Sequence, residues 1–104
     1  MPLLYGTIAA AGSDQAGATA IANRYTQVTG ADGSAGVRLP GATPGAEFYV
    51  YNVTAASGLK VYPASGDDIN DGTQDAAVTI EGKSLAVFVG MDTATWAAQY
   101  TADT

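Results

Sequence analysis

The chain of 104 residues contains no cysteine and no histidine. Without these side chains it cannot form a disulfide framework, a structural zinc site or an iron–sulfur centre. It also lacks the imidazole that activates the nucleophile in Ser–His and Cys–His enzymes. These absences predict a non-catalytic protein that needs no cofactor.

Positive charge is scarce as well, since 4 Lys and Arg stand against 10 Asp and Glu, for a net charge of −6. Nucleic-acid binding requires a basic surface, so none is expected. The chain has no run of 18 apolar residues, and residues 1–12 lack the basic start of a secretory signal. We therefore expect neither a membrane segment nor export.

Large apolar side chains are few. Alanine accounts for 21 of the 49 apolar residues, which leaves only 28 larger ones to build a core. The length suits a single domain, residues 1–104. A domain with so thin a core often depends on a partner surface for its stability.

Glycine, proline, asparagine and aspartate recur at short intervals, separated by runs rich in Val, Tyr, Phe, Ile and Thr. Such runs fit a pleated sheet. Eight short strands are predicted, at 3–9, 19–29, 36–39, 47–53, 59–63, 77–81, 84–90 and 94–101. This spacing indicates an all-β protein, a small β-sandwich with the jelly roll as its leading topology.

The strand predicted at 84–90 has the clearest alternation. Leu85, Val87 and Val89 share one face, which we interpret as the face toward the core. The preceding Glu81-Gly82-Lys83 suits a tight hairpin that would join this strand to the one before it.

Residues 9–29 allow two structures. Their alanine content would suit a helix with Ser13 as N-cap, whereas Gly12 and Gly17 favour an extended segment. We expect the extended form. Residues 1–17 could also act as a flexible N-terminal arm that docks onto a neighbouring molecule.

The segment 67–72 holds the densest group of oxygen ligands, Asp67-Asp68-Ile69-Asn70-Asp71-Gly72. A calcium loop places oxygen ligands at alternate positions and ends with a bidentate glutamate. Here an isoleucine occupies a ligand position, and the glutamate is missing. Because Asp and Asn also favour ordinary turns, we interpret the segment as a turn and keep a cation site as the alternative.

The aromatic residues offer the best contact surface. In the strand predicted at 47–53, Phe48 and Val50 lie on one face and Tyr49 and Tyr51 on the other. A strand that is apolar on both faces is either central in the core or covered by another subunit. Trp96 could likewise anchor an interface, although closing one end of the core is the interpretation we favour.

Several segments together resemble a small β module that recurs in virion structural proteins of tailed bacteriophages. They are Gly36-Val37-Arg38-Leu39-Pro40, Gly45 with 48–52, the run 59–67 that contains Val61-Tyr62-Pro63, Ile69-Asn70, and the closing 84–91 followed by Thr95-Trp96. The resemblance covers about residues 12–98.

This resemblance implies a structural role on the outer capsid surface of the virion, as a head decoration or cement protein. It also implies a homotrimer that binds the major capsid protein. Tyr49, Tyr51, Arg38 and Trp96 are then candidates for the subunit or capsid interface. Arg38 could pair with a carboxylate across a subunit boundary or, equally, within its own subunit.

Two alternatives remain open. Related modules in longer chains imply a structural or receptor-binding part of a tail fibre or head fibre. A glycan-cleaving enzyme would need two carboxylates, for which Glu47 and Glu81 are available, but no aromatic cleft is predicted around them.

Overall fold

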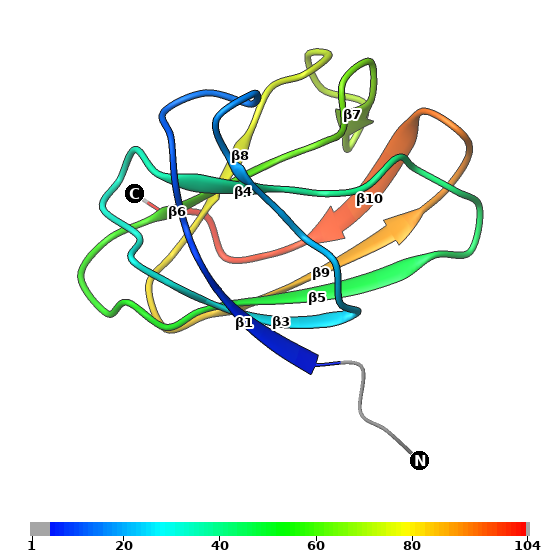
Figure 1. Ribbon diagram of the computed structural model, residues 1–104. Helices are drawn as coiled ribbons and strands as arrows, with labels where there is room; N and C mark the ends of the chain where they lie inside the picture. Colours follow the sequence, from blue (N-terminus) through cyan, green and yellow to red (C-terminus); the bar gives the residue numbers. More distant parts are fainter. Residues whose placement is uncertain (1–4, 104) are drawn as a thin grey trace.

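The structure, a computed structural model, describes residues 5–103, and within this range it contains ten short strands and no helix (Figure 1). The strands are β1 Tyr5–Ala9, β2 Thr19–Ala20, β3 Tyr25–Thr29, β4 Gly36–Arg38, β5 Glu47–Asn52, β6 Leu59–Tyr62, β7 Asp68–Ile69, β8 Val78–Ile80, β9 Leu85–Gly90 and β10 Thr95–Gln99. The predicted all-β fold is thus confirmed.

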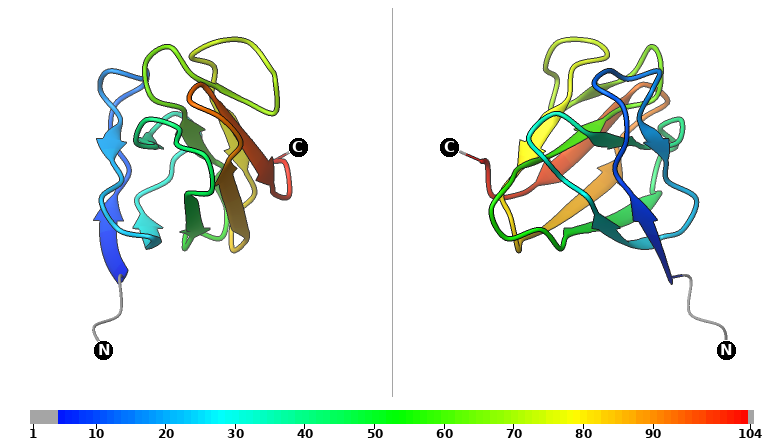
Figure 2. Two further views of the ribbon diagram at one scale, coloured as in Figure 1. Left: turned by 90° about the vertical axis from the view of Figure 1, so that its right-hand side faces the viewer. Right: turned by 60° about the vertical axis from the view of Figure 1, so that its left-hand side comes forward.

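The strands form two sheets that face each other. The six-stranded sheet has the order β1-β3-β5-β9-β10-β7, and the four-stranded sheet has the order β2-β4-β6-β8. The first six strands alternate between the sheets, and their neighbours within each sheet run parallel. This part of the chain therefore winds as a coil of three rungs, where a rung is one strand of each sheet: β1 with β2, β3 with β4, and β5 with β6. Figure 2 (left) shows the rungs following one another from β1 onward.

The last four strands close the far end of the coil. β8 runs antiparallel to β6, β9 runs antiparallel to β5, and β10 pairs with both β9 and the two-residue β7. β7 lies inside the segment that the sequence predicted to be a turn.

The predicted jelly roll is wrong, because a jelly roll is antiparallel whereas β1, β3 and β5 run parallel. The alternation of apolar and polar residues marks where a strand lies but not its direction. The connections at 10–18, 30–35 and 53–58 each cross to the other sheet, so the next strand of the same sheet comes one full rung later. The arrangement is solenoid-like.

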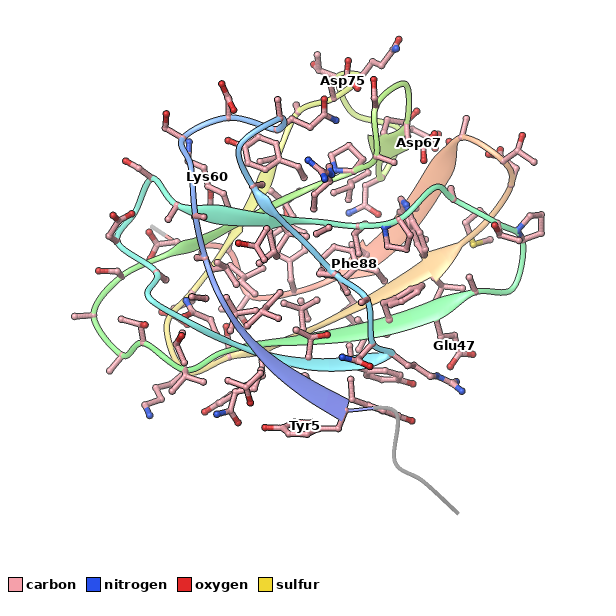
Figure 3. All side chains as sticks on the ribbon, viewed as in Figure 1. Tyr5, Glu47, Lys60, Asp67, Asp75 and Phe88 are labelled. Atoms are coloured by element: carbon pink, nitrogen blue, oxygen red, sulfur yellow. The ribbon has the colours of Figure 1, made fainter. Side chains whose placement is uncertain are left out.

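The core lies between the two sheets. Strands of both sheets supply most of its largest fully buried apolar side chains, which include Trp96, Phe88, Leu39, Leu59, Ile80, Val28, Val37, Val50 and Val61. Phe48 packs edge-on against Trp96, with ring centroids 5.6 Å apart. Phe88 appears between the sheets in Figure 3.

The face of β9 that carries Leu85, Val87 and Val89 points outward, contrary to our interpretation. Ala86 and Phe88 are buried instead, and Leu85 is 53% exposed. The predicted hairpin is also wrong, because Glu81-Gly82-Lys83 carries the chain from the four-stranded sheet to the six-stranded one. The first error arises because β9 is apolar on its two faces, so its pattern does not identify the inner one.

Residues 19–29 are extended as expected, but they form two strands in different sheets, β2 and β3. Within the predicted N-terminal arm, residues 5–9 form β1, which pairs in parallel with β3. Residues 1–4 of that arm lie outside the described residues.

Candidate interaction surface on the six-stranded sheet

The outer face of the six-stranded sheet carries an unusual density of aromatic rings. The strand register aligns Tyr5 with Tyr25 and Tyr25 with Tyr49, so the three tyrosines form one row across β1, β3 and β5. A second row aligns Gln27, Tyr51 and Leu85. We call these six residues the tyrosine face.

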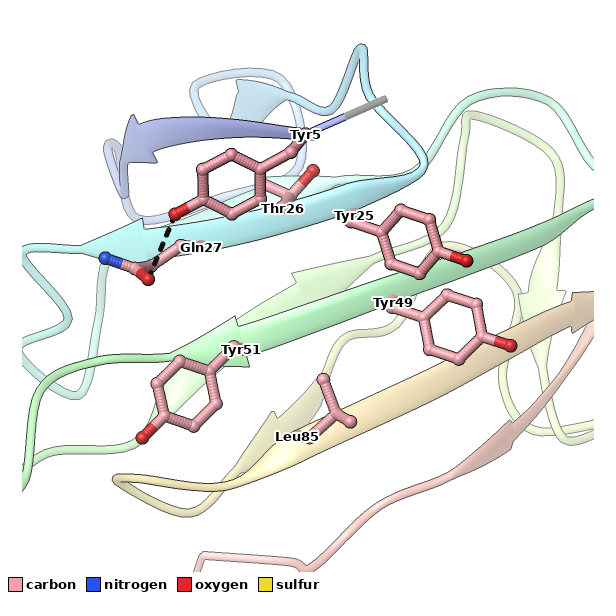
Figure 4. Close-up of a pocket in the computed structure, with 7 residues that line it drawn as sticks. All are labelled: Tyr5, Tyr25, Thr26, Gln27, Tyr49, Tyr51 and Leu85. Carbon is pink, nitrogen blue, oxygen red and sulfur yellow. Dashed lines mark hydrogen bonds between the residues drawn. The ribbon is translucent and has the colours of Figure 1, made fainter. Parts of the chain in front are cut away.

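The rings surround a shallow depression of about 260 Å³ that Figure 4 shows in close-up. Tyr25 and Tyr49 stack with their centroids 4.9 Å apart and their planes 18° from parallel. On the other side of the depression, the Tyr5 hydroxyl donates to Gln27 Oε1 at 3.1 Å. These contacts hold the rings in place before any partner arrives, which lowers the entropy cost of binding.

One ion pair borders the tyrosine face. Arg24 Nη2 donates to Glu47 Oε1 at 2.7 Å, and the Arg24 guanidinium also lies 5.7 Å from the centre of the Tyr25 ring. The hydrogen bond from Arg24 to Glu47 raises the pKa of Arg24. The negative charge of Glu47 raises the pKa of Tyr49, whose hydroxyl donates to the same carboxylate oxygen at 3.3 Å.

The apolar surface continues along the sheet. Val87, Val89 and Ala97 line a second shallow depression of about 340 Å³. Tyr5 is 52% exposed and Tyr25 42%, while Tyr49 and Tyr51 are half-buried. Half-exposed aromatic rings on a rigid sheet supply apolar contact area with a polar tip, which suits contact with another macromolecule.

The structure brings only two of the four predicted interface residues to this surface, Tyr49 and Tyr51. Arg38 lies in β4 on the other sheet, where its Nη1 donates to the carbonyl oxygen of Gln15 at 2.9 Å. Arg38 therefore stabilises a loop within its own chain. Trp96 is fully buried and offers no surface to a partner, in keeping with the core position that we favoured.

The acidic segment 67–72 uses much of its polar capacity for hydrogen bonds to other parts of the chain. Buried Asp67 accepts a hydrogen bond from the Ala42 N–H at 2.8 Å, and the Asn70 side chain bonds both backbone groups of Ala98. Asn70 and Asp71 both adopt a left-handed backbone with φ of 57°. No group of three or more acidic, histidine or cysteine side chains suited to a metal ion occurs within residues 5–103.

Sequence reasoning missed the other four members of the tyrosine face, which are Tyr5, Tyr25, Gln27 and Leu85. A signal for the two tyrosines was present, because Tyr5-Gly6-Thr7-Ile8 and Tyr25-Thr26-Gln27-Val28 share a pattern of tyrosine followed three residues later by a β-branched residue. Tyr49 follows Tyr25 after a similar interval. Such spacing marks equivalent positions on successive rungs of a coil.

No family model, curated protein or solved structure matches this chain. No helix long and apolar enough to cross a membrane is found within residues 5–103.

Proposed function

We propose that this protein is a non-catalytic structural protein that decorates the outer surface of a bacteriophage capsid and binds it through the tyrosine face. The observation that carries the proposal is the six-stranded sheet, which is apolar on both faces: its inner face builds the core, and its outer face exposes stacked tyrosines. The resemblance of the chain to phage virion modules supports the choice of the capsid as partner.

Binding alone would suffice for such a role. Each copy contributes modest contact energy, and repetition over a capsid lattice multiplies the effect on the particle. The extended, flat geometry of the tyrosine face fits contact with a broad surface better than enclosure of a small molecule.

The arrangement of the carboxylates argues against a glycan-cleaving enzyme. Glu47 begins β5, whereas Glu81 lies beside the end of β5, where Asn52 Nδ2 donates to its carbonyl oxygen. The length of the strand separates the two backbones by roughly 17 Å. A pair of catalytic carboxylates works at about 5 to 10 Å.

Purified virions of a phage that encodes this chain test the proposal. We expect quantitative mass spectrometry to find hundreds of copies per particle and electron microscopy to place them on the head. The Tyr25→Ser/Tyr49→Ser variant should bind heads more weakly than wild type. Met91→Ser is the matched control, because Met91 is a 59% exposed apolar residue outside the tyrosine face.

A few copies per particle, confined to the tail, would contradict the proposal and favour the tail-fibre alternative. If the double tyrosine variant binds heads as well as wild type does, the proposed decoration role is not contradicted, but the tyrosine face is not the contact surface.

A further inference from the structure

β1 forms one edge of the six-stranded sheet. It pairs with β3 on one side, and no described strand lies on its other side, as Figure 2 (left) shows. Its sequence, Tyr-Gly-Thr-Ile-Ala, contains neither a charged residue nor a proline. Charges, prolines and very short strands are the usual means by which proteins keep sheet edges from pairing, and β1 has none of them.

The other sheet edges are protected. At the edge of β8, the Glu81 N–H donates to the Thr101 carbonyl oxygen and the Asp103 N–H donates to that of Thr79, so the C-terminal segment covers this strand. β7 and β2 are edges of only two residues each. β1, with five residues, is therefore the longest edge strand in the described part of the chain and the least protected.

The backbone of β1 presents its free groups in alternation. The Ala10 N–H donates to the Thr29 carbonyl oxygen at 2.8 Å, so even-numbered residues direct their groups toward β3. In a strand, the groups of Tyr5, Thr7 and Ala9 then point away from the sheet. The carbonyl oxygen of Ala9 accepts the Thr19 hydroxyl at 2.6 Å from that side, which agrees with this direction. Ala9 therefore offers a second strand its N–H and the remaining lone pair of its oxygen.

The charge distribution permits a second copy of the chain at this edge. All six net negative charges fall in residues 47–104, which hold eight acidic residues and two lysines, whereas residues 1–46 carry two charges of each sign. Asp67 and Asp75 lie on the opposite side of the molecule from Tyr5 (Figure 3). Two copies can thus meet at β1 with Asp67 and Asp75 of each copy far from the contact.

We propose that two copies of this chain pair through β1, antiparallel and about a two-fold axis at Thr7. The outward groups of Thr7 would bond those of Thr7 in the other copy, and Tyr5 would lie opposite Ala9. This register is self-complementary, as a two-fold contact requires. It joins two six-stranded sheets into one continuous sheet and places two tyrosine faces side by side on it.

The pairing is independent of the proposed function, and it replaces the trimer implied by the family resemblance. A contact in which the same strand meets itself closes with two copies and generates no three-fold assembly. The mass in solution therefore separates the two possibilities.

The charge of residue 7 tests the register. By sedimentation equilibrium, we expect the wild type to be a dimer at micromolar concentration. Thr7→Lys and Thr7→Glu should each dimerise at least about tenfold more weakly, because like charges would face each other across the axis. An equimolar mixture of the two variants should recover a heterodimer, since Lys and Glu then face each other. Thr7→Val, which is uncharged, is the control and should stay dimeric.

Thr7→Pro provides a second test. It deletes an N–H that points away from β3, so circular dichroism and thermal stability should stay close to wild type while dimerisation weakens. A wild-type monomer at concentrations up to about 100 µM, a trimer, or a dimer insensitive to Thr7→Lys would each overturn the proposal. Failure of the mixture to form heterodimers would overturn the register.

Discussion

Asn52 is a fully buried polar side chain at the end of β5 that joins three parts of the chain. Its Nδ2 donates to the carbonyl oxygens of Ser57, Ile80 and Glu81, and its Oδ1 accepts the Thr54 N–H. Removal of the amide would take one hydrogen-bond partner from each of these groups, although the Glu81 carbonyl oxygen would keep the Ser84 hydroxyl.

Asn52→Ala should therefore lower the free energy of unfolding by about 2 to 3 kcal/mol. Urea denaturation followed by tryptophan fluorescence measures this loss. Gln99→Ala, at an exposed position, should change the stability by less than about 0.5 kcal/mol. Equal effects of the two substitutions would show that the buried network contributes nothing.

Gly90 ends β9 where another backbone passes against it. A Cβ at this position would overlap the carbonyl oxygen of Thr43, whereas a Cβ at Gly41 would meet nothing within 4 Å. Gly90→Ala should cost about 1 to 3 kcal/mol through forced backbone movement. Gly41→Ala should be neutral or slightly stabilising, because it reduces the freedom of the unfolded chain. Thermal unfolding of both variants checks the contrast, and a neutral Gly90→Ala would contradict the close approach.

Tyr49 should report on the charge of Glu47. Because that charge raises the pKa of Tyr49 above its ordinary value of 10.0, Glu47→Gln should lower the pKa toward 10.0. The unfolded chain loses the Tyr49 proton at lower pH than the folded one, so this group makes wild-type stability fall as the pH rises above about 10. NMR titration of labelled tyrosines measures the shift. Glu81→Gln, away from the tyrosine face, should leave it unchanged.

The C-terminal segment covers the edge of β8. Residues 101–103 bond this strand on both sides of the isolated bridge between Ile80 and Ala102. A chain ending at Tyr100 should lose about 2 kcal/mol of stability. It should also self-associate, because it exposes the edge of a strand whose Ile80 is otherwise fully buried. Urea denaturation and light scattering measure the two effects. Asp103→Asn, which keeps the backbone bonds, should show neither.

The elements also show how much the sequence alone could predict. Strands such as β5 and β9 were located to within one or two residues, because β-branched and aromatic runs between turn residues depend on local preferences. Pairing partners and directions were not accessible, since they depend on contacts between residues about 20 positions apart. The same limit affected the candidate site. The apolar outer face of β5 could be predicted from its sequence, but its alignment with Tyr5 and Tyr25 depends on the register between β1, β3 and β5.

The uneven distribution of charge along the chain predicts how dimerisation depends on salt concentration. The surface around β1 is close to neutral, so dimerisation should change less than about threefold between roughly 50 and 500 mM sodium chloride. Sedimentation at the two salt concentrations measures this. A dimer that strengthens steeply with salt would indicate that the acidic residues 47–104 repel each other across the interface, and hence that the contact lies elsewhere.

The coil allows the molecule to become longer by the addition of whole rungs. Its rungs advance by about 4.8 Å each, and each contacts only its neighbours, with the differences in length between rungs absorbed by the loops that join the sheets. Duplication of residues 25–46, which span β3, β4 and the return to the first sheet, would add one strand to each sheet without altering the closing strands. The number of rungs thus sets the length of the molecule along the coil axis, so a chain of this fold can fix a distance between two partners.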